Sequence, residues 1–513
     1  MSHQQRGRAL ASPARLTLDP AFRIAPVEPR LFGSFVEHMG RCVYTGVFEP
    51  GHPAADADGF RTDVLELTRE LGVTLVRYPG GNFVSNYQWE DGVGPVEDRP
   101  PRLDLAWRSL ESNRFGLGEF MAWAGKAGVE PMMALNLGTR GVADALRLVE
   151  YANYPGGTRM SELRRAHGAD KPYDIRLWCL GNELDGPWQL GHKTAAEYGR
   201  LAAETARALK RFDPGLSLVA CGSSNSGMPT FAGWEAEVLE AAYDMVDYVS
   251  LHAYYDPSDG DVDSFLASAS DMDHMIRSIA ATADHVGAKL RNPRRIDLSF
   301  DEWNVWYQSR FKGESSLEWA EAPRLIEDTY DVTDAVVVGS LLIALLRNAD
   351  RVKIACQAQL ANVIAPIRTE PGGPAWRQTI FHPFALTARH ARGEVLRVEP
   401  EGPVISTARY GEAPAIWATA THDDATGEIA LFVVNRDRHG PCRLDVELRA
   451  PVRPVEHLEI TDDDLSAANT ADSPDRVTPR PGSGLRMNGH RAELTLPPVS
   501  WTIVRFAPES PQE

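Results

Sequence analysis

The chain has 513 residues, too many for one ordinary domain, and 43% of them are apolar, enough to bury a substantial core. We therefore expect two domains. The formal net charge is −18 at pH 7 and is spread along the sequence, which argues against nucleic acid or an anionic membrane surface as a partner and favours a neutral substrate.

The sequence carries no sign of export or of membrane insertion. Residues 1–20 hold no apolar stretch typical of a signal peptide, and no run elsewhere approaches the roughly 18 apolar residues that a membrane helix requires. The five cysteines are widely spaced and never arranged as Cys-x-x-Cys, which predicts neither a disulfide framework nor a zinc site. We expect a cytoplasmic protein with buried, reduced cysteines.

From about residue 30 to residue 380, short β-prone runs alternate with longer segments of helical period. This alternation is typical of repeated βα units and a parallel sheet. Eight runs are expected to form strands, the number that closes a (β/α)8 TIM-type barrel. They are Leu31–Val36, Thr74–Arg77, Pro131–Leu135, Arg176–Leu180, Leu216–Ala220, Tyr248–Leu251, Ile296–Phe300 and Val352–Cys356.

Amphipathic segments between these runs predict the helices of the barrel, because their apolar residues recur at helical spacing. The segments are Phe60–Leu71, Leu117–Ala127, Val142–Ala152, Thr194–Lys210, Trp234–Asp244, Asp271–Val286 and Tyr330–Arg347.

After about residue 384 the pattern changes to strands without intervening helices, which predicts a C-terminal β-sandwich of jelly-roll-like type. The expected strands are Val395–Val398, Val404–Tyr410, Ala415–Thr421, Glu428–Asn435, Arg443–Leu448 and Ser500–Phe506. Residues 461–484 are rich in turn formers and are interpreted as a long surface loop. We therefore divide the chain into an N-terminal segment (1–24) that could join the sandwich, a barrel (25–384) and a sandwich (385–513).

Two glutamates end short apolar runs that we expect to be barrel strands. Glu183 follows Leu-Trp-Cys-Leu-Gly-Asn, and Glu302 follows Asp-Leu-Ser-Phe-Asp. Their separation of 119 residues corresponds to three βα units of about 40 residues each. Strand ends of this kind open onto the catalytic face of a barrel, and a pair of acids there is what glycoside hydrolysis needs.

The neighbours of the two acids make the site more specific. Asn182 diverges from Glu183 as the chain leaves its strand, so it can reach a different hydroxyl of the same sugar. His252 and Tyr254, in the expected loop after the sixth strand, would point to the same side. Tyr254 could donate to Glu302 and keep it ionised, whereas burial would keep Glu183 protonated.

Several motifs, taken together, resemble the intracellular α-L-arabinofuranosidases of glycoside hydrolase family 51. They are Arg-Tyr-Pro-Gly-Gly-Asn-Phe at 77–83, Trp-Glu-Asp-Gly-Val-Gly-Pro at 89–95, Gly-Asn-Glu at 181–183 and Asp-Glu-Trp-Asn at 301–304. The resemblance extends from Gly33 to the terminal sandwich.

The resemblance implies a retaining, exo-acting enzyme that releases terminal arabinofuranose from arabino-oligosaccharides, arabinan or arabinoxylan fragments. Glu183 would be the general acid/base and Glu302 the nucleophile, with Arg77 holding Glu302. It also implies a homo-oligomer, a hexamer, and neither a cofactor nor a metal. The residues expected to bind the sugar are Glu37, Asn82, Asn182, His252, Tyr254 and Gln359.

Some alternatives stay open. A β-xylosidase or an endo-β-glucanase of the same barrel clan could use the same two acids, and a non-catalytic carbohydrate-binding protein could carry a similar sandwich. Trp107, Trp303 and Trp306 are either platforms for sugar rings or ordinary buried aromatics.

Overall fold

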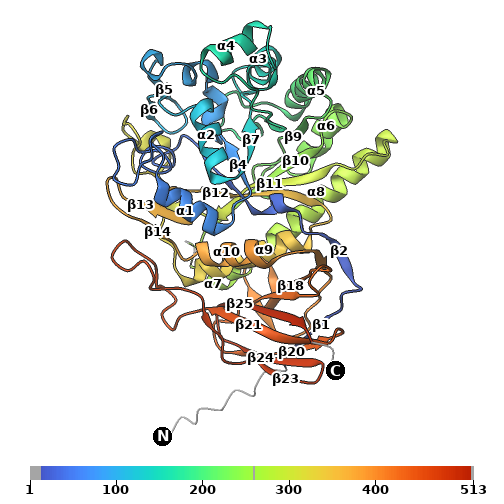
Figure 1. Cartoon of the computed structure of the whole chain (residues 1–513). Coiled ribbons are helices and arrows are strands. Elements are labelled where there is room, and N and C mark those ends of the chain that lie inside the picture. Colours follow the sequence, from blue (N-terminus) through green and yellow to red (C-terminus); the bar gives the residue numbers. More distant parts are fainter. Residues whose placement is uncertain (1–12, 258–259, 510–513) are drawn as a thin grey trace.

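The computed structural model describes residues 13–257 and 260–509. The barrel and the sandwich lie one above the other, with helices α9 (Val332–Arg347) and α10 (Phe381–His390) between them (Figure 1). The first twelve residues of the predicted N-terminal segment and the last four of the predicted sandwich lie outside the described residues. No helix of the described part is long and apolar enough to cross a membrane.

The eight strands predicted for the barrel are confirmed, and they close into one parallel sheet. Around the barrel, each strand pairs with the strand that follows it in this series, and the last pairs with the first. The strands are β3 (Gly33–Phe35), β4 (Leu75–Tyr78), β7 (Glu130–Ala134), β8 (Leu177–Leu180), β9 (Ser217–Ala220), β10 (Tyr248–Tyr255), β11 (Asp297–Val305) and β12 (Val352–Ala358).

The helices cover the outside of the barrel, and their boundaries follow local signals. At the start of α5, for example, Thr194 and Glu197 form a reciprocal capping box, which satisfies two amide groups that the helix leaves free. Besides α9 and α10, the helices are α1 (Thr62–Leu71), α2 (Leu117–Ala127), α3 (Val142–Asn153), α4 (Arg159–Ala166), α5 (Ala195–Phe212), α6 (Gly233–Ala242), α7 (Val262–Leu266) and α8 (Ala269–Leu290).

Strands β10 and β11 continue well beyond their predicted ends. His252 and Tyr254 therefore lie on β10 itself, and their prediction as loop residues is wrong. Strand β11 also contains a bulge, because Ser250 pairs with Ser299 whereas His252 pairs with Glu302. The extra residue in β11 changes the direction of the side chains that follow it.

The terminal domain consists of two facing sheets around a second apolar core. The first sheet has the order β2-β15-β18-β19-β25-β21-β22 and the second has the order β1-β20-β24-β23. The strands are β1 (Ala14–Leu18), β2 (Arg23–Pro26), β15 (Glu394–Leu396), β18 (Ile416–His422), β19 (Ile429–Asn435), β20 (Cys442–Leu448), β21 (Val452–Ile460), β22 (Arg480–Pro481), β23 (Arg486–Asn488), β24 (Arg491–Leu496) and β25 (Ser500–Pro508).

The barrel and the terminal domain also contain short helices and hairpins. The 3-10 helices are η1 (Pro29–Phe32), η2 (Asn82–Asn86), η3 (Trp89–Gly92), η4 (Val96–Asp98), η5 (Gln308–Arg310) and η6 (Glu314–Ser316). Three hairpins are made by β5 (Arg102–Asp104) with β6 (Ser109–Glu111), β13 (Ile367–Thr369) with β14 (Ala375–Arg377), and β16 (Val404–Thr407) with β17 (Gly411–Pro414).

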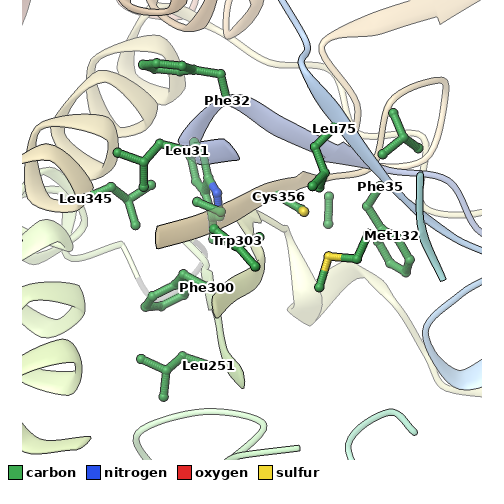
Figure 2. Packing of buried hydrophobic residues seen from close by; sticks show 14 of the residues in the cluster. Leu31, Phe32, Phe35, Leu75, Met132, Leu251, Phe300, Trp303, Leu345 and Cys356 are labelled. Carbon is green, nitrogen blue, oxygen red and sulfur yellow. The ribbon is translucent and has the colours of Figure 1, made fainter. Parts of the chain in front are cut away.

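The barrel core and the interface with the sandwich form one apolar cluster. Figure 2 shows part of this cluster, with side chains from strands β3, β4, β7 and β10 to β12 and from helix α9. On α9, Gly339 faces Trp501 of β25, and a β-carbon at Gly339 would come within 2.1 Å of the indole. Glycine at this position therefore lets the helix approach the sandwich closely.

Two features of the C-terminal half differ from the prediction. Helix α10 runs across the predicted boundary at residue 384, and the first sandwich strand after the barrel begins at Glu394. The segment 461–484 is only partly a surface loop, because Asn469 and Val477 are buried and exchange two hydrogen bonds. The five cysteines are all buried and free, as predicted.

Candidate active site

The two predicted acids meet at the carboxyl-terminal end of the barrel strands. Glu183 lies three residues beyond the end of β8, and Glu302 lies on β11. One carboxylate oxygen of Glu183, one of Glu302 and a ring nitrogen of His252 all lie within 4.8 Å of one another. This spacing resembles the ~5–5.5 Å between the acids of retaining glycosidases more than the ~6.5–9.5 Å of inverting ones.

The backbone turns sharply where it presents Glu183. Gly181 and Glu183 have φ angles of 100° and 45°, and the left-handed region costs a residue with a β-carbon roughly 1–2 kcal/mol. The contacts around the turn compensate for this cost. The amide of Gly186 donates to the carbonyl of Glu183 (2.9 Å), and the side chain of Gln189 donates to the carbonyl of Asn182 (2.6 Å).

Glu302 is held by two donors from neighbouring strands. Arg77 of β4 donates from Nη1 to Oε1 (2.6 Å), and Tyr254 of β10 donates to Oε2 (2.8 Å), the hydrogen bond that the sequence predicts. Arg77 is fully buried, and it also donates from Nη2 to Oδ1 of Asn182 (2.8 Å). Charge-assisted hydrogen bonds of this kind are short and strong, and they fix the orientation of the carboxylate.

His252 lies buried between three carboxyl groups. Its Nδ1 lies 2.9 Å from Oε1 of Glu183 and 3.5 Å from Oε2 of Glu302, and its Nε2 lies 3.0 Å from Oδ1 of Asp301. Burial opposes the charge, but Glu302, Asp301 and Glu183 together raise the pKa of His252 to about 10. Both ring nitrogens therefore act as donors.

The pKa of Glu183 is raised, chiefly because the carboxyl group is buried, and the charge of Glu302 raises it further. The hydrogen bond from His252 opposes this rise. Glu183 thus lies in surroundings that favour the protonated form of a general acid.

Glu37 forms the inner wall of the site. Its Oε1 accepts hydrogen bonds from the amide of Phe83 (3.0 Å) and from the indole of Trp107 (2.9 Å), and its Oε2 accepts one from the side chain of Gln359 (3.1 Å). Burial, only partly offset by the Phe83 and Trp107 hydrogen bonds, raises the pKa of Glu37 to about 8.

The two predicted asparagines lie next to each other. Nδ2 of Asn182 donates to Oδ1 of Asn82 (3.4 Å). Oδ1 of Asn182 accepts from Arg77, so the same guanidinium orients Asn182 and Glu302. The structure therefore brings together all eight residues predicted for the site.

A pocket of about 430 Å³ opens over these residues. Of the predicted residues, Glu37, Asn82, Glu183, Tyr254, Glu302 and Gln359 line it, whereas Asn182 and His252 lie just behind its wall. Its outer part is lined by residues including Trp188, Asn225, Trp306, Gln308, Phe311 and Glu314. A larger groove of about 870 Å³ lies on the sandwich, away from the acids.

The three tryptophans have different positions. Trp107 and Trp306 line the pocket. Trp303 has no exposed surface and stacks on Phe384 of α10, so a role as a sugar platform is wrong for this residue. Its side chain points away from the pocket because side chains alternate along a strand.

Two residues that contact the group of side chains around the acids were not predicted from the sequence. Asp301 contacts His252, and Nε of Arg77 lies 3.6 Å from Oδ2 of Asp301. Consecutive residues of a regular strand point to opposite faces, so Asp301 and Glu302 share the interior only because of the bulge in β11. Trp188 was missed because nothing in the sequence indicates that the loop after Glu183 folds back toward it.

Comparison with known proteins decides the family. The profile of the alpha-L-arabinofuranosidase 1 domain matches residues 67–277, and that of the alpha-L-arabinofuranosidase C-terminal domain matches residues 301–500. The chain is 62% identical over 503 residues to an intracellular exo-alpha-(1->5)-L-arabinofuranosidase of Streptomyces lividans, covering 97% of this chain and 76% of the relative. The chain belongs to the family 51 α-L-arabinofuranosidases.

Other relatives agree with this assignment. An exo-alpha-(1->6)-L-arabinofuranosidase of Bifidobacterium longum is 53% identical, over 96% of this chain and 97% of the relative. The solved structure of AbfB, a family 51 α-L-arabinofuranosidase from Bifidobacterium longum, superposes with a TM-score of 0.93 at 48% identity, covering 96% of this chain and all of that one. An arabinofuranosidase from Thermotoga maritima in complex with arabinose gives a TM-score of 0.86 at 31% identity, covering 96% and 99%.

The site also contains side chains of the types that ligate metal ions. In the described part of the chain, Glu183, His252 and Glu302 form a group that is close enough to hold an ion. A histidine must be neutral to ligate a metal, and the raised pKa of His252 opposes this. The donor set is therefore poorly suited to a metal, and the expectation of a metal-free site stays a prediction.

Proposed function

We propose that this glycoside hydrolase removes terminal non-reducing α-L-arabinofuranosyl residues from arabino-oligosaccharides and from arabinan or arabinoxylan fragments, with retention of configuration. The observation that carries the proposal is the pair Glu183 and Glu302, whose carboxylate oxygens approach within 4.8 Å across one pocket. Membership of family 51 supports the choice of sugar.

In the first step, Glu302 attacks the anomeric carbon while Glu183 protonates the departing glycosidic oxygen. The carbon–oxygen bond to the leaving group breaks as the bond to Glu302 forms. In the second step, Glu183 takes a proton from water, whose oxygen bonds to the anomeric carbon and releases Glu302. The hydrogen bonds that Arg77 and Tyr254 donate stabilise the negative charge that returns to Glu302.

We assign hydroxyl recognition to the remaining predicted residues, with Glu37, Asn82 and Gln359 at the inner end of the pocket. Glu37 and Gln359 are almost fully buried, so the pocket closes behind them. A pocket that ends at buried side chains suits the terminal sugar of a chain, which supports exo action. Asn182, His252 and Tyr254 complete this set.

The preferred linkage is not part of the proposal, because relatives that cover almost the whole chain are named for (1->5) and for (1->6) linkages. We infer a cytoplasmic location, since several relatives are named intracellular. The hexamer that the family resemblance implies stays a prediction.

The test is hydrolysis of a panel of aryl glycosides followed by 1H NMR of the first product. We expect the α-L-arabinofuranoside to be the preferred substrate and the first sugar released to be the α-anomer. Preferential cleavage of a β-xyloside or of a β-glucan would support the rival hydrolases instead. Unchanged turnover in Glu183→Ala and Glu302→Ala variants would support a non-catalytic site.

A further inference from the structure

Trp188 is the most exposed aromatic residue of the pocket wall, and it contacts the general acid/base directly. Its side chain lines the outer part of the pocket, and 46% of the residue is exposed. Its indole Nε1 donates a 2.9 Å hydrogen bond to Oε2 of Glu183. The other two indoles of the pocket differ, because Trp107 donates to Glu37 and the nitrogen of Trp306 has no hydrogen-bond partner among the described residues.

The loop that carries Trp188 is fixed through its backbone and not through the indole. Two turns, from Gly186 to Glu183 and from Gln189 to Gly186, close the loop, and the buried side chain of Gln189 ties it to Asn182. Rotation of the Trp188 side chain therefore breaks the hydrogen bond to Glu183 without unfolding the loop. Exposed side chains change rotamer on a picosecond to nanosecond timescale.

Both oxygens of Glu183 are occupied in the free protein. Oε1 lies against the His252 cation, and Oε2 accepts from Trp188. Two donors stabilise a carboxylate, whereas the first step of the reaction needs a proton on this group. The second step needs the carboxylate, because Glu183 then acts as a base. One fixed set of donors cannot suit both steps equally well.

We propose that Trp188 is a removable hydrogen-bond donor that adapts Glu183 to its two successive roles. This inference rests on the proposed function. When the leaving group occupies the outer pocket, the indole gives up Oε2, and Glu183 keeps its proton for the glycosidic oxygen. After the leaving group departs, the indole returns and stabilises the carboxylate that takes a proton from water. Trp188 is thus a positioning residue that acts through Glu183.

The test is the pH dependence of kcat/KM for an aryl α-L-arabinofuranoside in Trp188→Phe. Removing a donor to the carboxylate raises the pKa of Glu183, and the basic limb of the profile reports loss of the protonated acid in the free enzyme. We therefore expect this limb to move to higher pH by about 0.5–1 unit, up to about tenfold in the ionisation constant. Trp188→Gln, which keeps an N–H donor without the ring, should restore part of the original position.

The matched control is Trp306→Phe, which removes an indole of the same pocket whose nitrogen donates to no described residue. A change in KM in this variant reports only the loss of a side chain from the pocket wall. The basic limb of its pH profile should therefore stay in place. If Trp188→Phe changes KM but leaves the limb where it is, Trp188 is only a wall and the inference is overturned.

A second readout does not depend on turnover. The emission difference between the wild type and Trp188→Phe isolates Trp188 from the other tryptophans, and its pH titration should show a step that disappears in Glu183→Gln. If this step is present but arabinofuranosides are not hydrolysed, the proposed function fails and the inference about the contact stands. If hydrolysis is normal and neither the limb nor the emission responds, the inference alone fails.

Discussion

Nδ1 of His252 lies 2.9 Å from Oε1 of Glu183, so a buried imidazole contacts the group to which we assign proton donation. His252 also faces Asp301 through Nε2, at 3.0 Å. Glu302, Asp301 and Glu183 together raise the pKa of His252 to about 10 despite its burial. We therefore expect the ionisation of His252 to affect both catalysis and stability.

This ionisation makes stability depend on pH in a defined direction. The pKa of His252 is higher in the folded than in the unfolded state, so its contribution is complete below about pH 6.5 and is lost as the pH rises through about 10. We expect the free energy of unfolding, measured with urea, to fall over this range in the wild type. The fall should be smaller in His252→Gln, whereas His274→Gln, on an exposed helix position, should leave it unchanged. An identical fall in all three proteins would contradict the charge assigned to His252.

Arg77 should be needed for folding as well as for catalysis. It is buried with Glu302, Asp301 and Asn182 around it, and removal of one partner from a buried ion pair costs about 3–5 kcal/mol. We expect Arg77→Met to lower the free energy of unfolding by this amount. Arg147→Met removes a surface ion pair with Asp144, which keeps its pair with Arg140, and should cost less than about 1 kcal/mol. Equal costs in urea unfolding would show that the Arg77 cluster is not a stabilising unit.

Substitutions of Trp303 and Trp107 should affect different properties, the stability of the fold for Trp303 and the binding of substrate for Trp107. Trp303 is buried against Phe384, so Trp303→Phe should lower the free energy of unfolding by about 1–3 kcal/mol and leave KM unchanged. Trp107→Phe removes the indole donor to Glu37 and should raise KM with a smaller effect on stability. Steady-state kinetics and urea unfolding of both variants check this, and a raised KM in Trp303→Phe would contradict the position of that side chain.

The interface between the barrel and the sandwich should be sensitive at Gly339. A β-carbon there would come within 2.1 Å of Trp501, so Gly339→Ala should destabilise the protein by roughly 1–3 kcal/mol. Gly125, on the exposed side of α2, has nothing near its missing side chain, and alanine there should be neutral or stabilising by up to about 1 kcal/mol. Thermal unfolding of the two variants should shift the Tm in opposite directions or, for Gly125→Ala, not at all. A Gly339→Ala protein as stable as the wild type would rule out close packing at this point.

Much of the fold was predictable because the barrel strands are short apolar runs that alternate with amphipathic helices. All eight barrel strands were predicted, and helix α2 was predicted with both ends correct. Strand β21 was missed, since its sequence Val-Arg-Pro-Val-Glu-His-Leu-Glu-Ile contains proline and polar residues and is only half-buried. Pairing with β25 and β22 decides its conformation.

The positions of the two acids and of the neighbours to which we assign sugar binding were predictable because their motifs end the strands. The bulge in β11 was not, because it depends on pairing with β10 and places Asp301 beside Glu302. The contact between Trp188 and Glu183 was not predictable either, because it follows from two turns whose backbone conformation includes a positive φ at Glu183. Tertiary contacts, and not local propensity, decide these features.

The roles of the two acids can be separated by azide. Glu302→Ala leaves space on the face where the nucleophile lies, so azide should displace the leaving group of an aryl α-L-arabinofuranoside directly and give the β-azide. Glu183→Ala still forms the bond to Glu302, and azide then attacks from the opposite face and gives the α-azide.

The most direct test of the account is therefore the anomeric configuration of these two azides, read by 1H NMR. We predict the β-azide from Glu302→Ala and the α-azide from Glu183→Ala. The opposite assignment would exchange the roles of the two acids, and the β-azide from both variants would contradict a covalent intermediate on Glu302.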